Sequence, residues 1–443
     1  MKRLFVAIGL ILASVAVSNA VDEGINLGVA RLHLWGELSG TYDDNVRLVV
    51  GDGEIQDRTI FTEEKDVTGE SQTESDIYYE LTLGGRLYRE TDSFLAGLSL
   101  AYLNRTYTDF SDLDNDSYIQ EAELLFGERE VDTFTLGFKE AYRKVFDYEN
   151  VAYPDDFTNP DTQSLFLSED RTERVSRELI DLGAVLTWRI TEKLASDYSL
   201  GYGSIEYDTE FLYDWSDIKG QAEFDYKVTD KTALLLTGQY GMQESDSLEN
   251  EPDYYVLRGG FLNRSTDKLT FKGGVGAGRY DRFSEKEGLP GSVSSVEDGV
   301  KDESGGSVDY LSYDIAGDWD LSQRTKLQII GRNAVQPAAQ YNDNVKIVSV
   351  ASVGLSRRIL EDFRLAGTIS YRNDDYQDLV EIDTNEYIDQ EDTIWGGHLR
   401  LGYEPQDGYL NVYVAASYED RTTNIPNEDY DQLRLSIGLK LKI

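Results

Sequence analysis

The chain alternates short polar turns with long acidic segments, and the stretches between them alternate apolar and polar residues. A β-barrel that crosses a membrane has short turns on one side, long loops on the other, and strands of period two. This pattern of turns, loops and alternating stretches therefore predicts an all-β fold, a single transmembrane antiparallel up-and-down β-barrel. The short turns are Thr91–Ser93, Val131–Thr133, Thr191–Lys193, Thr229–Lys231, Thr266–Lys268, Ser322–Arg324, Leu360–Asp362 and Pro405–Gly408.

Arg177–Ile190 shows the alternation most clearly. One phase is apolar and includes Leu182, Leu186 and Trp188, whereas the other includes Asp181 and Arg189. Successive side chains of a strand point to opposite faces. We expect the apolar phase to face lipid and the polar phase to face the lumen. A soluble sandwich would need a dry core, and the second phase is too polar and glycine-rich to form one.

Eight short turns and nine long loops give about eighteen strands, or sixteen if one weak hairpin is absent. An even count places both termini on the same, periplasmic side, with the long acidic loops extracellular. No linker or change of pattern interrupts the strands, so residues 21–443 are expected to form one outer-membrane barrel domain.

The first twenty residues have the form of a secretory signal peptide. Lys2 and Arg3 precede the apolar run Leu4–Val17, and small residues end at Ala20. Signal-directed export and a bacterial outer-membrane location of Gram-negative type are therefore expected. Only residues 21–29 precede the first strand. Any constriction would then come from loops such as Tyr42–Ser75, Lys144–Ser176 or Arg282–Ser307.

The chain is strongly acidic, with 83 Asp and Glu against 42 Lys and Arg and a formal charge of -41. We do not expect this acidic chain to bind nucleic acid, because contacts with phosphate need Lys and Arg. The expected partners are outer-membrane lipid, lipopolysaccharide and the barrel-insertion machinery, with small solutes or polysaccharide as further possibilities. Acidic loops would give the mouth a negative potential and weak cation selectivity.

Aromatic residues gather at the strand ends, where interfacial girdles form in membrane barrels. At the long-loop ends we expect Tyr42, Tyr107, Tyr118, Tyr207, Tyr310, Tyr376 and Tyr430 in one girdle. After the short turns we expect Phe94, Phe134, Phe363 and Tyr409 in the other.

The polar phase supplies charges of both signs, which we expect to line the pore and to form transverse charge ladders. The predicted pore-lining residues are Arg86, Glu121, Glu123, Lys139, Arg189, Asp197, Glu223, Asp225, Arg258, Asp314, Asp318, Arg332, Arg364, His398 and Arg400.

An acidic triplet and a glycine-rich run are further candidates for binding sites. Asp112, Asp114 and Asp116 could hold a calcium ion at the surface, although a solvated acidic loop is the preferred interpretation. No other cofactor is expected. The glycine-rich run 273–278 lies inside a strand without a following helix, so it predicts relief of crowding rather than a phosphate loop.

Catalysis has few candidate residues, since His33 and His398 are the only histidines. A hydrolase would need a histidine with a serine or aspartate partner at the membrane edge. No such arrangement is evident, and no catalytic residue is predicted.

The segment YDDNV, Tyr42–Val46, follows LHLWGELSG at the end of the first predicted strand, and YNDNV at Tyr341–Val345 nearly repeats it. Asp and Asn at a strand exit favour tight turns. With the signal peptide, this motif resembles the β-barrel porin 2 family of outer-membrane proteins. The resemblance implies outer-membrane residence, a pore, and for some members an association with polysaccharide export. The chain ends Leu441-Lys442-Ile443, unlike the usual aromatic ending.

The leading functional expectation is a porin-like passive channel for small hydrophilic solutes, or a pore associated with polysaccharide export. A non-conducting barrel that is structural or binds partners at the surface is the main alternative. A His-dependent outer-membrane hydrolase is the third.

Overall fold

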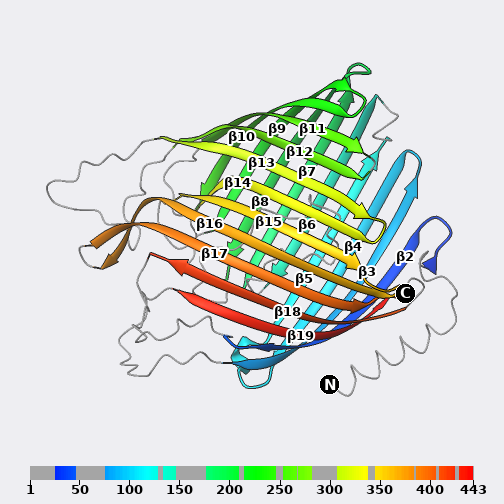
Figure 1. The fold of residues 1–443 in the computed structure, drawn as a ribbon, viewed down its shortest axis with the longest axis vertical. Coiled ribbons are helices and arrows are strands. Elements are labelled where there is room, and N and C mark those ends of the chain that lie inside the picture. Colours follow the sequence, from blue (N-terminus) through cyan, green and yellow to red (C-terminus); the bar gives the residue numbers. More distant parts are fainter. Residues whose placement is uncertain are drawn as a thin grey trace.

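The computed structural model describes residues 25–45, 75–127, 133–145, 176–208, 214–245, 253–266, 268–281, 307–337, 345–383, 386–405, 409–424 and 429–442. This part of the chain forms one closed antiparallel barrel of eighteen strands, β2 to β19 (Figure 1). A further strand of two residues, β1 (Ile25–Asn26), pairs with the start of β2. Among the described residues, no helix is long and apolar enough to cross a membrane.

The barrel strands are β2 (Arg31–Asp43), β3 (Asp76–Thr91), β4 (Phe94–Tyr107), β5 (Asn115–Phe126), β6 (Phe134–Val145), β7 (Arg177–Arg189), β8 (Leu194–Tyr207), β9 (Trp215–Thr229), β10 (Thr232–Ser245), β11 (Asp253–Thr266), β12 (Leu269–Asp281), β13 (Ser307–Ser322), β14 (Thr325–Pro337), β15 (Val345–Arg358), β16 (Phe363–Asp383), β17 (Glu386–Tyr403), β18 (Leu410–Thr423) and β19 (Tyr430–Lys442). A 3-10 turn, η1 (Ser111–Leu113), lies between β4 and β5.

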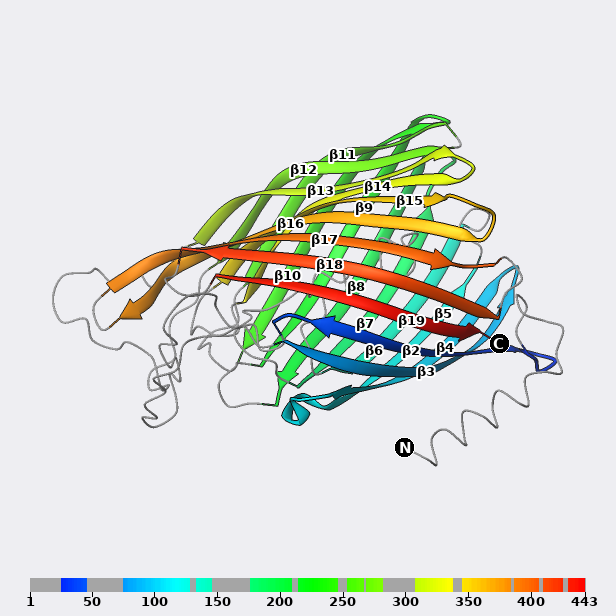
Figure 2. The same cartoon turned by 60° about the horizontal axis from the view of Figure 1, so that its bottom comes forward.

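Each strand pairs with the next along the chain, and β19 pairs with β2 to close the barrel. Figure 2 shows the blue β2 beside the red β19, with β19 ending at the same end of the barrel as the short turns. The predicted fold class and strand count are confirmed. The predicted signal peptide lies outside the described residues, as do most residues of the three long loops named above.

The β16–β17 hairpin is longer than the sequence suggests. The acidic segment 377–392 between two alternating stretches predicts a long loop, but in the structure pairing continues beyond a bulge to Leu379↔Asp389 and Asp383↔Glu386. Figure 1 shows this orange hairpin extending beyond its neighbours. The acidic composition of the segment favoured a loop, but antiparallel pairing with its own partner strand needs only backbone groups.

Aromatic side chains form two bands on the outer face, one at each end of the strands. At the short-turn end, cross-strand ring pairs include Phe134 on Trp188, with centroids 5.7 Å apart, and Phe94 on Phe126. At the long-loop end, Tyr102 lies beside Tyr118 at 5.2 Å. Exposed apolar side chains occupy the outer face between the bands. A barrel with this exterior suits a lipid bilayer flanked by two interfaces.

The predicted membership of the long-loop girdle is partly wrong. Tyr42 and Tyr118 are exposed on the outer face, whereas Tyr107, Tyr207, Tyr376 and Tyr430 are buried. The register places these four, like Tyr310, on the inner face. A position at the end of a strand does not determine the face, because the face depends on whether the residue number is odd or even within that strand.

Several aromatic rings on the inner face lie over glycines of the neighbouring strand. Tyr310 is directly opposite Gly278, and a Cβ at Gly278 would overlap its ring. The same relation holds for Trp35 over Gly84, Tyr254 over Gly241, and Tyr413 over Gly438. The expectation that glycines in the run 273–278 relieve crowding is confirmed at Gly278.

The wall between β13 and β14 is paired over only part of its length. Pairing stops at Asp314↔Arg332, although β14 continues in register with β15 as far as Pro337. Beyond that point the Asn333 side chain replaces the missing backbone bonds. Its Nδ2 donates to the Leu311 carbonyl at 2.5 Å, and its Oδ1 accepts from the Tyr313 N–H at 2.8 Å.

Beyond this point the ends of β14 and β15 stay paired with each other and lie on the lumen side of β11 to β13. Alternation would place Val335 and its register partner Ile347 on the outer face, but both pack against inward-facing Tyr254, Val256 and Tyr280. Val335 is only 8 % exposed, compared with 47 % for Val353 further along the outer face of β15. The sheet therefore overlaps itself here, and the overlap narrows the lumen.

Candidate functional site: the charged lumen

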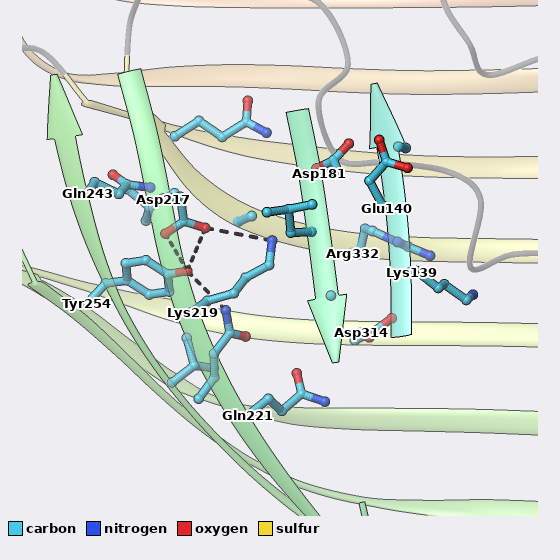
Figure 3. A pocket seen from close by; sticks show the side chains of 18 of the residues that line it. Lys139, Glu140, Asp181, Asp217, Lys219, Gln221, Gln243, Tyr254, Asp314 and Arg332 are labelled. Carbon is cyan, nitrogen blue, oxygen red and sulfur yellow. Dashed lines mark hydrogen bonds and ion pairs between the residues drawn. The ribbon is translucent and has the colours of Figure 1, made fainter. Parts of the chain in front are cut away.

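One cavity of about 630 Å³ lies inside the barrel and touches strands β3 to β7, β9 to β11, β13 and β14. Glu121 on β5 and Arg332 on β14 both line it. These strands are nine apart in a ring of eighteen, so the two side chains come from opposite walls. Figure 3 shows Lys139, Asp181 and Arg332 around this space.

Seven of the predicted pore-lining residues lie on this cavity. They are Arg86, Glu121, Glu123, Lys139, Arg258, Asp314 and Arg332. The register places the others on the inner face as well, namely Arg189, Asp197, Glu223, Asp225, Asp318, Arg364, His398 and Arg400. Sequence reasoning omitted Asp217, Lys219 and Gln221, although they share the alternation phase of Glu223 and could have been found that way.

Ion pairs on the inner face join side chains of neighbouring strands or of strands separated by one or two others. Arg86 pairs with Glu123 across β4, and Arg143 pairs with Glu121 at 3.1 Å. Lys272 on β12 reaches Glu223 on β9 at 2.6 Å. Such pairs connect neighbouring strands and fix long side chains against the wall.

A buried polar network supports one side of the cavity (Figure 3). The Tyr254 hydroxyl donates to Asp217, with oxygen separations of 3.2 and 3.3 Å, and accepts from the Gln239 amide at 3.3 Å. Lys219 lies 3.7 Å from Asp217. Asp217 and Tyr254 are almost fully buried. The network holds Tyr254 where Val335 of the overlapping strand packs on it.

Asp197, Glu223 and Asp225 form an acidic cluster on β8 and β9, with carboxylate oxygens within 4.8 Å of one another. In the described part of the chain, this group could share a hard cation. Two of its members already have donors, because Thr237 donates to Glu223 at 3.0 Å and Thr187 donates to Asp197 at 2.5 Å.

The calcium expectation at Asp112, Asp114 and Asp116 stays a prediction. Asp114 accepts the Tyr107 N–H at 2.7 Å, and Asp116 accepts the Tyr102 hydroxyl at 2.6 Å. These bonds occupy one oxygen of each carboxylate and give both residues a structural role between β4 and β5.

The two histidines face the lumen on β2 and β17, with β18 and β19 between them. His33 shares a hydrogen bond with the Tyr88 hydroxyl at 3.3 Å. The structure therefore places the two imidazoles in different local surroundings rather than in one group.

The YDDNV motif joins the first barrel strand to the last. Asp43 is completely buried and accepts both the Gln432 amide, at 2.8 and 2.9 Å, and the Arg434 guanidinium at 3.3 Å. It also accepts the Asn45 N–H at 3.1 Å, which is the local turn bond expected of this motif. Asn45 in turn donates to the Asp431 carbonyl at 2.9 Å.

Asp44 extends this seam just beyond the end of β2. Its carboxylate accepts the Leu433 N–H at 2.6 Å, and its own N–H donates to the Leu433 carbonyl at 3.1 Å. Burial raises the pKa of Asp44, and the hydrogen bond from Leu433 only partly offsets that effect. The motif thus adds side-chain bonds at the long-loop end of the β2–β19 pairing.

No family model matches the chain, and no curated protein matches it. Among solved structures, it is similar to OccK2 (OpdF) of Pseudomonas aeruginosa, at 12% identity and TM-score 0.43, covering 94% of this chain and 98% of that one. It is also similar to OpdK of Pseudomonas aeruginosa with vanillate, at 12% identity and TM-score 0.44, covering 93% and 99%. A third is the FrpB iron transporter from Neisseria meningitidis, at 8% identity and TM-score 0.40, covering 93% and 81%.

Proposed function

We propose that this chain is a channel of the bacterial outer membrane through which small hydrophilic solutes diffuse. The observation that carries the proposal is the cavity lined by charged side chains from opposite walls of a closed barrel. A barrel of this strand number can enclose an aqueous lumen. The apolar outer face and its two aromatic bands support membrane residence.

In the half of the barrel nearer the short turns, an acidic cluster and a pair of arginines lie on opposite walls, with Lys272 paired to Glu223 and Glu404 3.9 Å from Arg364. The acidic cluster Asp197, Glu223 and Asp225 lies on β8 and β9, whereas Arg364 and Arg400 lie on β16 and β17 of the opposite wall. Opposed walls of unlike charge set up a field across the path, which orients dipolar solutes and disfavours apolar ones.

The overlap of β14 and β15 favours small solutes as cargo. Asn333 to Gln336 come from this overlap and line the same cavity as residues of β5 and β6. A wall that bends into the lumen leaves less room for an extended polysaccharide. The association with polysaccharide export that the family resemblance implies is therefore not part of this proposal.

We propose weak cation selectivity, which the formal charge of -41 supports. In planar bilayers with a KCl gradient, the reconstituted protein should conduct, and its reversal potential should have the sign of cation preference. The preference should decline toward about 1 M salt, where the Debye length falls to roughly 3 Å. Salt-independent selectivity would show that the preference does not come from exposed charge.

Two results would contradict parts of this proposal in different ways. Anion preference at low salt would refute the cation selectivity while leaving the channel intact. Absence of conductance from protein that migrates as a folded barrel in unheated SDS gels would refute the channel and favour the non-conducting barrel.

A further inference from the structure

Two arginines on the cavity wall differ from most other cations of the lumen. Arg258 on β11 and Arg332 on β14 both line the cavity, and within the described part of the chain neither forms an ion pair. The Arg258 Nη1 donates to the Ser312 hydroxyl at 3.4 Å. The Arg332 Nε is buried and has no hydrogen-bond acceptor among the described residues.

Ion pairing is common elsewhere on the inner face. Arg105 pairs with Glu80 at 2.9 Å, Arg421 with Asp392 at 2.6 Å, and Lys440 with Glu37 at 3.4 Å. A buried donor without an acceptor is costly, because the group loses its water without gaining a partner. The guanidinium N–H groups of Arg258 and Arg332 are therefore available to donate hydrogen bonds to a solute in the lumen.

One position in the wall between the two arginines, Gly276, has no side chain. Arg258 is opposite Gly276 of β12, which is opposite Ser312 of β13. Strands lie about 4.8 Å apart, so the contact with Ser312 brings the Arg258 guanidinium across β12 to the strand next to Arg332. A Cβ at Gly276 would collide with the backbone of Leu257. Gly276 therefore places no side chain where the Arg258 guanidinium crosses β12.

The groups around Arg258 and Arg332 limit which solutes this part of the cavity can bind. A guanidinium presents a planar fork of donors that matches carboxylate and phosphate oxygens. Asp314 is the register partner of Arg332 and faces the same cavity, and one carboxylate leaves the two arginines with a net positive charge. Tyr310 lies beside Arg258 and lines the cavity too, which adds an aromatic surface.

We propose that Arg258, Arg332 and Ser312 form a binding subsite for the oxyanion of a small solute, either a carboxylate or a phosphate monoester. The subsite lies in the wall of the lumen and would hold an anionic solute during passage. The inference rests on the proposed function only in assuming that solutes enter the lumen. Its test uses equilibrium binding, which does not require conduction.

Isothermal titration of the detergent-solubilised full barrel with glucuronate, glucose 6-phosphate and glucose provides this test. These three hexoses differ in whether they carry a carboxylate, a phosphate or neither. We expect the two anions to bind and glucose not to bind measurably. Arg258→Gln and Arg332→Gln should each weaken anion binding about tenfold or more, because a charge-assisted bidentate contact is lost.

Arg143→Gln is the matched control, because it removes the same charge from the same cavity but from a guanidinium already paired with Glu121. Binding in this variant should stay within about twofold of the wild type, well below the tenfold effect of a lost 1.4 kcal/mol contact. Retention of folded migration in unheated gels verifies each variant barrel. Equal binding of glucose, equal losses in all three variants, or no anion binding by a folded barrel would each overturn the subsite. A conducting protein that fails this binding test would leave the channel proposal standing.

Discussion

At the scale of single residues, glycine decides where aromatic rings can lie on the inner face. Tyr310 and Tyr254 lie flat against the wall because Gly278 and Gly241 opposite them have no side chain. Glycine in a strand weakens the strand by itself but permits close approach of a neighbour. Both rings line the cavity, and the glycines allow them to pack closely against its wall.

Gly278→Ala should displace the Tyr310 ring, since the added Cβ would overlap it. We expect a loss of about 1–3 kcal/mol of stability, typical of overpacking. The folded fraction in SDS gels across a temperature series measures this loss, and single-channel conductance should fall as the ring moves inward.

Gly183→Ala is the control for that substitution, because a Cβ at Gly183 on the same cavity meets nothing within 4 Å. Its stability should change by roughly 0.5 kcal/mol or less. Equal effects of the two substitutions would show that loss of glycine flexibility, rather than contact with Tyr310, controls stability.

At the scale of elements, the break between β13 and β14 shapes the lumen. Where β14 leaves β13, main-chain donors and acceptors of these two strands lose their pairing and must find other partners. Asn333 provides one donor and one acceptor for β13 at the point where pairing ends. The overlapping strands gain the apolar contacts of Val335 and Ile347 in exchange.

Asn333→Ala should leave the Leu311 carbonyl and the Tyr313 N–H without their partner. We expect a loss of about 1–3 kcal/mol, the usual cost of buried groups left unsatisfied. Conductance should also become more variable as the ends of β14 and β15 loosen. Thermal unfolding in detergent and single-channel recording measure the two effects.

Asn411→Ala on the inner face of β18 serves as the comparison, since no hydrogen bond of its side chain bridges two strands of the described barrel. This substitution should change neither the stability nor the conductance measurably. If Asn333→Ala were equally neutral, the Asn333 bonds would not hold the overlap in place.

At the scale of the whole molecule, closure depends on a contact between segments almost the full chain apart. Asp43 and Asn45 of β2 and its exit bond to the start of β19 through Gln432, Arg434 and Asp431. This pairing closes the longest loop in the chain, so its entropic cost is the largest of any pairing in the barrel. Side-chain bonds at its open end offset part of that cost.

Asp43→Ala should destabilise the closed barrel by about 2–4 kcal/mol, because a buried carboxylate with charged and polar partners is removed. Asp230→Ala, in the exposed turn between β9 and β10, should have little effect. Refolding into detergent followed by gel migration would measure closure. A fully closed and equally stable Asp43→Ala barrel would show that the backbone pairing alone is sufficient.

Much of the candidate site could be predicted from alternation alone. Because the side-chain period of a strand is two, one correct phase places every charge of that strand on one face, as for Asp225 and Asp314. Alternation predicts the wrong face where the ends of β14 and β15 lie over the inner face of the barrel. Val335 and Ile347 keep the outer phase in sequence but lie inside, since no local residue pattern records that β14 leaves β13.

The sequence alone determined the barrel, its strand number and the end at which the short turns lie, because these follow from local alternation and turn residues. Only the tertiary structure decided which charges meet, how the YDDNV motif closes the ring, and how far the lumen narrows. Those features depend on register between strands and on contacts across the barrel. The physical reason is that strand period is a local property, whereas pairing partners and sheet overlap are set by packing between residues far apart in the chain.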